Sequence, residues 1–217
     1  MSASTGRRAR GTGTPPLDEI VTAALAFIDA HGLDRFSISA LAAEMGAIQP
    51  NMYRRIASRR QLLDLVVDRL MADAGLPDSD PADWHVWLAD WGVRVRRSWH
   101  GHPAAAGLVH HGSTQSVAAI EAVLGVFLGA FPAEFVVVGM QAYLAHVFGT
   151  ILLEARTAPA DATAPALRSE LSADTLRHLA EHERIVAAQG AEAPTGEQTF
   201  LAGLTILLDG LRPHVKR

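Results

Sequence analysis

Residues 38–60 constrain the fold of this chain more than any other stretch, because two short apolar stripes flank a glycine turn. Ser37 is placed to cap a first helix. The apolar face of that helix comprises Ile38, Leu41, Ala42 and Met45. Gly46 follows, where a helix end commonly adopts the left-handed backbone conformation that glycine tolerates. The pattern predicts a short helix that ends in a tight turn.

A second short helix is predicted from about Gln49 to about Ile56. Pro50 suits its first turn, because a missing N–H costs nothing there. Met52 and Ile56 would anchor this helix to the first one. Asn51, Tyr53, Arg54 and Arg55 would then face outward. Ser58 forms a capping-box pattern with Gln61 and predicts the start of a further helix.

Two helices joined by a tight glycine turn are typical of the DNA-binding helix-turn-helix motif. The second, basic helix is the one that would enter the major groove. The alternative is an ordinary helical hairpin whose basic residues form a solvated face. Capping, the turn glycine and the basic surface all agree with each other, which favours the DNA-binding interpretation.

Four segments of the chain resemble the TetR family of bacterial transcriptional regulators. These segments are residues 36–39, FSIS; 41–46, LAAEMG; 49–53, QPNMY; and 58–63, SRRQLL. This resemblance covers about residues 17–68. A weaker similarity, to the tetracycline-repressor-type ligand domain, extends over about residues 84–211. It involves Trp91 with Arg94, His102-Pro103, Gly149 with Glu154, and Phe200 to Leu211.

The resemblance implies a set of residues that contact DNA. Groove-facing positions would be Gln49, Pro50, Asn51, Tyr53, Arg54 and Arg55. Tyr53 and Arg59 would lie near phosphates, and Ser37 and Ser39 would open the preceding helix near the DNA backbone. Family members often have Thr and Arg in this first helix, so Ile38 and Ser39 are a departure. Glutamine suits adenine and arginine suits guanine.

The distribution of charge agrees with a DNA-binding N-terminal part. The net charge is −4, but residues 1–60 hold eight arginines and five acidic residues, which leaves +3 there and −7 elsewhere. The chain has no cysteine, which excludes disulfides and thiolate metal sites. No apolar run approaches the length of a membrane span, and the N-terminus lacks the apolar core of a signal peptide. We therefore expect a cytoplasmic protein with no membrane partner.

The chain is predicted to be all-α and to have two domains. Residues 1–14 would be a disordered basic arm, residues 15–74 the helix-turn-helix domain, and residues 82–217 a helical ligand-binding and dimerisation domain. The expected helices are 17–31, 59–74, 82–100, 114–130, 132–154, 167–188 and 199–211. A short helix to Val109, a linker at 157–166 and a loop at 189–197 complete the prediction.

Two apolar helices, 132–154 and 197–211, predict a homodimer. They carry more apolar surface than one small domain can easily cover, so pairing with a second copy as a four-helix bundle is expected. The resemblance implies the same assembly. A twofold dimer implies a palindromic double-stranded DNA operator with half-sites about 34–36 Å apart or slightly more.

A small-molecule effector, apolar or aromatic, is expected inside the second domain, because ligand cavities are mostly apolar. The predicted wall consists of Trp87, Trp91, Val95, Phe127, Tyr143 and Val147. His110 and Glu154 would lie at the edge of the cavity. By resemblance they stand where the tetracycline-responsive members hold a drug-bound magnesium ion. A structural histidine turn and a surface glutamate are the favoured interpretation of these two residues, and no metal or cofactor is predicted.

Residues 178–182 match the H-x-x-E-H zinc-protease pattern through His178, Glu181 and His182. This raises the alternative of an all-helical metal-dependent hydrolase. The helix is polar and offers no third ligand, so we predict that the chain is not an enzyme. A DNA-binding architectural protein without a ligand is a third hypothesis.

Overall fold

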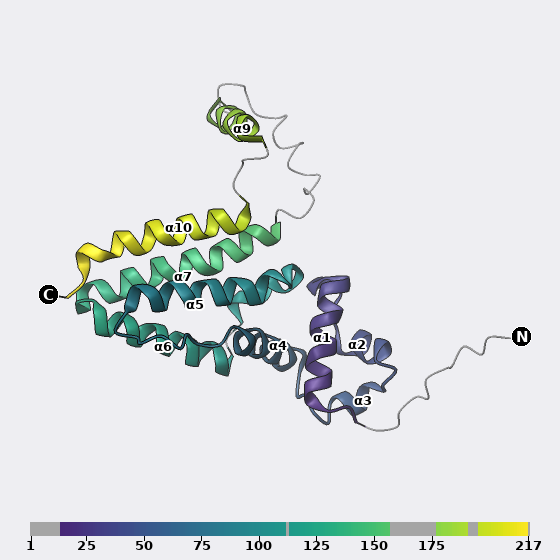
Figure 1. The fold of residues 1–217 in the computed structure, drawn as a ribbon. Coiled ribbons are helices and arrows are strands. Elements are labelled where there is room, and N and C mark those ends of the chain that lie inside the picture. Colours follow the sequence, from purple (N-terminus) through teal and green to yellow (C-terminus); the bar gives the residue numbers. More distant parts are fainter. Residues whose placement is uncertain (1–13, 112, 157–176, 191–194, 217) are drawn as a thin grey trace, which may run out of the picture.

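The computed structural model describes residues 14–111, 113–156, 177–190 and 195–216. Within these ranges all regular secondary structure is helical, which confirms the all-α prediction. Figure 1 shows a small head (α1 to α3), a connecting helix (α4) and an elongated body. The predicted arm, the linker at 157–166 and the first ten residues of the predicted helix 167–188 lie outside the described residues, apart from Thr14.

The head forms around α1, Leu17–His31, whose apolar stripe is buried. After a short 3₁₀ turn, Leu33–Arg35, come α2, Ile38–Glu44, and α3, Gln49–Met52. The second helix is thus shorter than predicted, and the prediction that it reaches Ile56 is wrong. Residues 53–55 form a turn instead, in which the Ile56 N–H still bonds the Met52 carbonyl. Met52 and Ile56 are buried as predicted.

The connecting helix α4 has the predicted bounds, Arg59–Ala74. The Ser58 hydroxyl accepts a hydrogen bond from the Gln61 N–H, but the Gln61 side chain accepts from the Ala57 N–H. The cap is therefore shifted by one residue from the regular capping box. Helix α4 packs on α1, α5 and α6. It ends at Gly75, whose φ of +63° is a backbone conformation that favours glycine.

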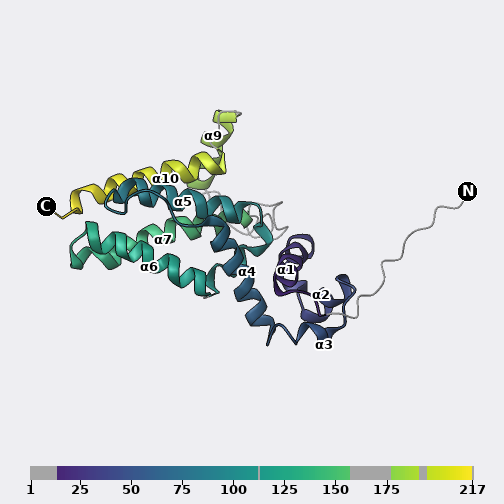
Figure 2. The ribbon, with the colours of Figure 1, turned by 60° about the horizontal axis from the view of Figure 1, so that its bottom comes forward.

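The body is a bundle of four long helices, α5, α6, α7 and α10. Their bounds are Trp84–His100, Thr114–Ala130, Ala133–Arg156 and Gly196–Leu211. A 3₁₀ segment, Pro103–His110, connects α5 to α6, and a short one, Arg212–His214, follows α10. Helix α9, Arg177–Gln189, stands apart from the bundle in Figures 1 and 2.

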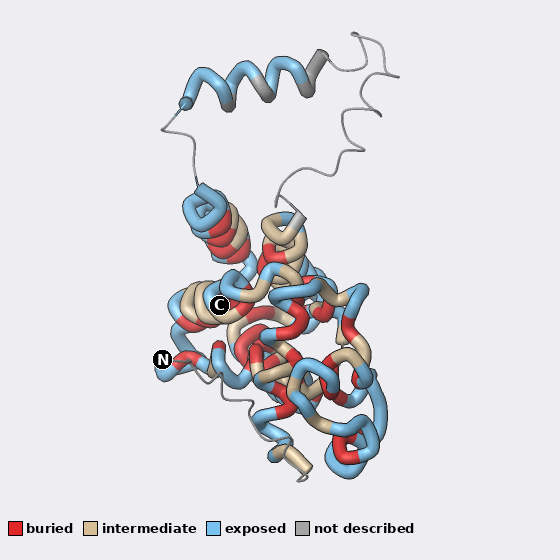
Figure 3. The backbone as a smooth tube through the Cα atoms, turned by 90° about the vertical axis from the view of Figure 1, so that its right-hand side faces the viewer, coloured by how far each residue is buried: buried red, intermediate tan, exposed pale blue. Residues whose placement is uncertain are grey.

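Helices α7 and α10 lie side by side and leave an apolar surface uncovered. The exposed side chains are Val137, Val138 and Leu153 on α7, with Leu201 and Ile206 on α10; Ile206 is 75% exposed. Figure 3 shows buried residues along one side of each helix only. The segment Ala133–Ala155 also meets a length and hydropathy test for a membrane span, contrary to the expectation that no apolar run approaches one. Core helices of soluble proteins pass the same test.

Polar contacts join the head and α4 to the body. His102 Nδ1 lies 2.7 Å from an Asp29 carboxylate oxygen, and His111 Nδ1 lies 3.0 Å from one of Asp64. The Ser98 hydroxyl, on α5, donates to the Leu70 carbonyl of α4 at 2.6 Å. Movement of α5 is therefore coupled directly to α4.

Candidate functional site

The α2–turn–α3 unit is held by local hydrogen bonds. The Ser37 hydroxyl accepts from the Ala40 N–H at 3.1 Å and caps α2 as predicted. Gly46 has a φ of +66°, and the next N–H, of Ala47, bonds the Ala42 carbonyl at 2.9 Å. This is the hydrogen-bond pattern of a glycine-terminated helix. It fixes the angle at which α3 leaves α2.

Most predicted DNA-contacting side chains lie on the surface of this unit. The exposed members are Ser39, Gln49, Pro50, Tyr53, Arg54, Arg55 and Arg59, while Ser37 is half-buried and bonded to Ser39. Arg54 and Arg55 form no ion pair within the described part of the chain. Two unpaired guanidinium groups next to an exposed helix are available for an anionic partner.

Asn51 differs from the prediction. Its exposed fraction is only 7%, and it has an interaction partner, so the expectation that it faces outward is wrong. The reason is geometric. Residues 51 and 52 are adjacent on a very short helix, and the side that packs Met52 into the head also takes in Asn51. Asn51 therefore helps to seat α3 on the head.

Arg59 braces the start of α2 in this structure. Its Nε donates to the Phe36 carbonyl at 3.1 Å and its Nη2 to the Leu33 carbonyl at 3.3 Å. The guanidinium carbon also lies 5.7 Å from the centre of the Phe36 ring. These bonds occupy part of the guanidinium, and its predicted phosphate contact stays a prediction.

The six residues predicted to wall a cavity lie in the core of the body. Trp87, Trp91, Val95, Phe127, Tyr143 and Val147 are all buried. The Tyr143 hydroxyl donates to the Leu88 carbonyl at 2.6 Å, and its ring centre lies 6.0 Å from that of Trp91. Burial raises the pKa of Tyr143 well above its usual value, because the phenolate would lose its hydration. None of the six lines the cavity described next, so their role in ligand binding stays a prediction.

A cavity of about 570 Å³ lies where α5 and the C-terminal end of α7 meet the N-terminus of α10. Its lining residues are Val93, Arg96, Arg97, His100, Glu154, Thr195, Gly196, Glu197, Phe200 and Leu201. Only Glu154 belonged to the predicted set. The sequence analysis missed Arg96 and Arg97; two adjacent arginines on a helix rich in tryptophan single out these residues, but not the cavity that they line.

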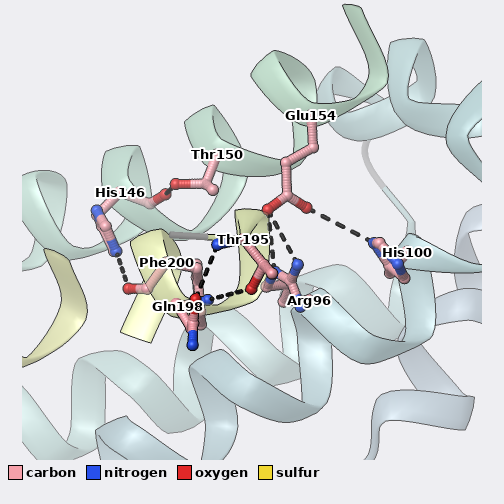
Figure 4. Close-up of polar contacts among 8 residues, drawn as sticks. All are labelled: Arg96, His100, His146, Thr150, Glu154, Thr195, Gln198 and Phe200. Carbon is pink, nitrogen blue, oxygen red and sulfur yellow. Dashed lines mark hydrogen bonds and ion pairs between the residues drawn. The ribbon is translucent and has the colours of Figure 1, made fainter. Parts of the chain in front are cut away.

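Arg96 and Glu154 form the polar centre of this cavity (Figure 4). Glu154 Oε1 accepts from Arg96 Nε at 3.2 Å and from Nη2 at 3.0 Å, and Oε2 lies 3.7 Å from His100 Nδ1. Arg96 is only 7% exposed, and its guanidinium carbon lies 5.5 Å from the centre of the Phe200 ring. The Glu154 carboxylate also approaches Gly196 so closely that a Cβ there would lie 2.9 Å from Oε1.

The structure does not place His110 in this group. His110 is exposed at the end of its 3₁₀ segment, and the neighbouring His111 is the one that binds Asp64. Glu154 is held by Arg96 and His100 instead. Among the described residues, no group of three or more His, Cys, Asp or Glu side chains is arranged to hold a metal ion.

The H-x-x-E-H segment lies on α9. The side chain of His178 is outside the described part, and that of His182 is exposed. The Glu181 carboxylate pairs with Arg184, at 2.6 and 2.8 Å, and this neighbour lowers the pKa of Glu181. A lowered pKa suits a solvated ion pair and is the opposite of what a general acid needs.

No protein-family model matches the chain. Two curated relatives are similar to part of it. One is the HTH-type transcriptional repressor DrrR1 of Streptomyces coeruleorubidus, 40% identical over 93 residues, which is 42% of this chain and 32% of that protein. The other is an HTH-type transcriptional regulator of Saccharopolyspora erythraea, 30% identical over 98 residues, 44% of this chain and 42% of that protein. The chain thus spans less than half the length of each curated relative.

Solved structures resemble the chain over nearly its whole length. The Streptomyces coelicolor TetR family protein ActR, in complex with (S)-DNPA, is 23% identical with a TM-score of 0.67, over 93% of this chain and 99% of that one. BioQ of Mycobacterium smegmatis is 21% identical with a TM-score of 0.64, over 92% and 99%. TetR of Acinetobacter baumannii is 18% identical with a TM-score of 0.64, over 92% and 97%. These similarities establish the fold. The relatives are named as regulators rather than enzymes, in agreement with the prediction that the chain is not an enzyme.

Proposed function

Because the chain has the fold of the TetR-family transcriptional regulators, we propose that it is a dimeric, cytoplasmic, DNA-binding repressor released from its operator by a small molecule. One observation carries the proposal. The α2–turn–α3 unit presents unpaired Arg54 and Arg55 beside Gln49 and Tyr53 on an exposed surface. The second helix of such a unit, with the residues that directly follow it, is the element that reads the major groove in helix-turn-helix proteins.

The charge of the chain supports the direction of this interaction. The part that contains the exposed arginines is net positive, whereas the rest is net negative. The excess positive charge belongs to Arg7, Arg8 and Arg10, so binding to phosphates is favoured at the N-terminal sixty residues and disfavoured at the rest of the chain. Arg54 and Arg55 would read guanine, and Gln49 would read adenine.

The uncovered apolar surface of α7 and α10 supports a homodimer. Leu153, Leu201 and Ile206 would be covered when the two helices pair with the same helices of a second copy. Twofold symmetry then places two heads on successive major grooves of a palindromic operator, about 34–36 Å apart.

A small-molecule effector is supported by the cavity between α5, α7 and α10. Its volume lies within the range of about 300–1,000 Å³ that is typical of ligand sites. Helix α5 contacts α4, and the bond from Ser98 to Leu70 joins the two directly. A ligand that binds one arrangement of α5 better than another would thus shift the head.

The proposal is tested by in vitro selection from randomised duplex DNA. The full-length protein should enrich a two-part palindrome, bind it in fluorescence anisotropy, and have twice the chain mass in light scattering at micromolar concentration. Enrichment of no sequence would contradict DNA readout. A clean monomer that retains its affinity for the selected duplex would contradict the dimer.

A further inference from the structure

The cavity beside Glu154 is lined by two arginines and two carboxylates, of which only Arg96 and Glu154 pair with each other. Arg96, Arg97 and His100 lie within two turns of α5 and all line it. Arg96 is already neutralised by Glu154, through two hydrogen bonds to Oε1. Removing one partner of such a shielded ion pair is costly, so we regard Arg96 and Glu154 as a structural part of the cavity wall.

Arg97 is in a different situation. Its side chain is exposed, it lines the cavity, and it forms no ion pair or side-chain hydrogen bond with any described residue. An arginine that faces a concave site without a carboxylate partner is suited to bind a planar oxyanion through two parallel hydrogen bonds. His100 lies one turn further along the same helix and lines the same cavity.

The N-terminus of α10, on the other side of the cavity, also favours an anionic ligand. Thr195 caps α10, with its hydroxyl accepting from the Gln198 N–H at 3.2 Å, and Gly196 begins the helix. The first backbone N–H groups of a sixteen-residue helix therefore point toward the cavity, and the positive end of its dipole adds to the charge of Arg97.

Val93 from α5, with Phe200 and Leu201 from α10, gives the cavity an apolar part. A ligand that matches this arrangement has one anionic end and an apolar skeleton.

We propose that this cavity binds amphiphilic organic acids, with the carboxylate held by Arg97 and the skeleton placed against Val93, Phe200 and Leu201. This names the ligand class of the proposed regulator, and it rests on that function only for its regulatory consequence. Arg97 immediately precedes Ser98, whose hydroxyl bonds the Leu70 carbonyl. An acid drawn to Arg97 thus acts on the residue that connects α5 to α4.

One lining residue works against the anion. Glu197 places a carboxylate in the first turn of α10, exposed at the cavity. Its charge repels an acid and leaves a neutral ligand almost unaffected. Glu197→Gln therefore tests the preference for anions in the opposite direction from Arg97→Gln.

The experiment measures binding by isothermal titration calorimetry on the full-length protein without DNA. The probes are two acid and amide pairs, 2-naphthoate with 2-naphthamide and octanoate with octanamide, which separate aromatic from aliphatic acids. We expect at least one acid to bind about tenfold or more tightly than its amide, the loss of one charge-assisted contact. Arg97→Gln should remove this preference, Arg97→Lys should retain part of it, and Glu197→Gln should strengthen acid binding several-fold.

The matched control is Arg94→Gln. Arg94 lies one turn earlier on α5, pairs with Asp90 at 3.0 Å, and does not line this cavity. Arg94→Gln removes the same charge as Arg97→Gln and should leave the preference for acids over amides intact. The proposal is overturned if no acid binds better than its amide, or if Arg97→Gln and Arg94→Gln weaken acid binding equally. Because no DNA is present, failure to select an operator would count against the proposed function and leave this result standing.

Discussion

The head and the body of this molecule carry their candidate sites in opposite ways. In the head, exposed polar side chains are displayed by a short unit whose shape is fixed by bonds between residues three to five positions apart. In the body, the candidate site is a cavity made by α5, α7 and α10, which are separated by up to about a hundred residues. The site in the head consists of side chains exposed by a local motif, whereas the site in the body is a space left between packed helices.

This difference explains why Trp91 and Arg54 behave differently under the same kind of reasoning. Arg54 lies in the exposed turn directly after α3, so its exposure is decided mainly by the residues next to it in the chain. An aromatic stripe on α5 can line a cavity or fill a core, and only its neighbours decide which. Here Tyr143 and Phe148 pack against Trp91, so the stripe fills the core.

The largest expected effect tests the body. Trp91→Ala should lower the free energy of unfolding by about 3–5 kcal/mol, because a fully buried indole is removed. Val86→Ala, at an exposed position of the same helix, should change it by less than about 0.5 kcal/mol. Guanidinium unfolding followed by circular dichroism measures both. A small loss for Trp91→Ala with altered ligand binding would return Trp91 to the wall of a cavity and break the comparison.

The next effect tests the head. Arg54→Ala or Arg55→Ala should weaken binding to the selected operator by about 1–3 kcal/mol without changing thermal stability, since neither side chain is paired. Arg59→Ala should weaken binding to all duplexes alike. It should also lower the melting temperature, because its bonds to the Leu33 and Phe36 carbonyls are lost.

Anisotropy titrations on the selected duplex and on a scrambled duplex, at one salt concentration, separate these cases. Equal losses on both duplexes for all three variants would refute the assignment of base readout to Arg54 and Arg55.

A smaller effect concerns the turn between α2 and α3. Gly46→Ala should destabilise the protein by about 1 kcal/mol, because its φ of +66° is strained for residues with a Cβ. Nothing lies within 4 Å of the added Cβ, so the cost is confined to the backbone. Gly125→Ala, in an open position of α6, should instead stabilise by about 0.5–1 kcal/mol. Thermal unfolding of both variants measures the contrast, which identical shifts would contradict.

The smallest effect is a pH dependence that belongs to the body. The folded pKa of Tyr143 is raised above the unfolded value of 10, because the phenolate is disfavoured in the core. Its contribution is complete below pH 10 and is lost as the pH rises above that value. Tyr143→Phe should therefore be less stable at neutral pH, through the lost bond to Leu88, but should lose less stability at alkaline pH. Parallel unfolding curves at pH 9 and 11 decide this, and equal alkaline losses would contradict it.

The sequence predicted the bounds of α4 and α6 correctly because both begin at a serine whose hydroxyl caps the helix. Helix α4 ends directly before Gly75, and α6 ends two residues before Pro132. The start of α10 was predicted one to three residues late, although Thr195 and Gln198 form a complete capping box in the sequence pattern. The length of α3 was overestimated because an anchored side chain, Ile56, does not require a helical backbone before it.

The cavity could not be predicted in the same way. Glu154 was singled out by resemblance, but its partner Arg96 lies 58 residues away, and no pattern in the sequence joins them. Gly196 approaches Glu154 only because α10 returns to that end of the bundle. Such a site depends on the relative position of three helices, which is set by the whole core rather than by any one segment.

Helix α4 is sixteen residues long, so it extends for about 24 Å between the body and the head. Because α1 packs on it, the head follows its direction as one piece. A tilt of about 5° at the body end displaces the far end by roughly 2 Å, and a symmetric dimer doubles the change to roughly 4 Å between the heads. Hydrogen bonds to base edges tolerate only a few tenths of an ångström, so in the proposed regulator this helix would act as a lever arm. In the proposed dimer, a change in the body too small to alter its fold would be enough to separate the two proposed DNA-reading surfaces from adjacent grooves.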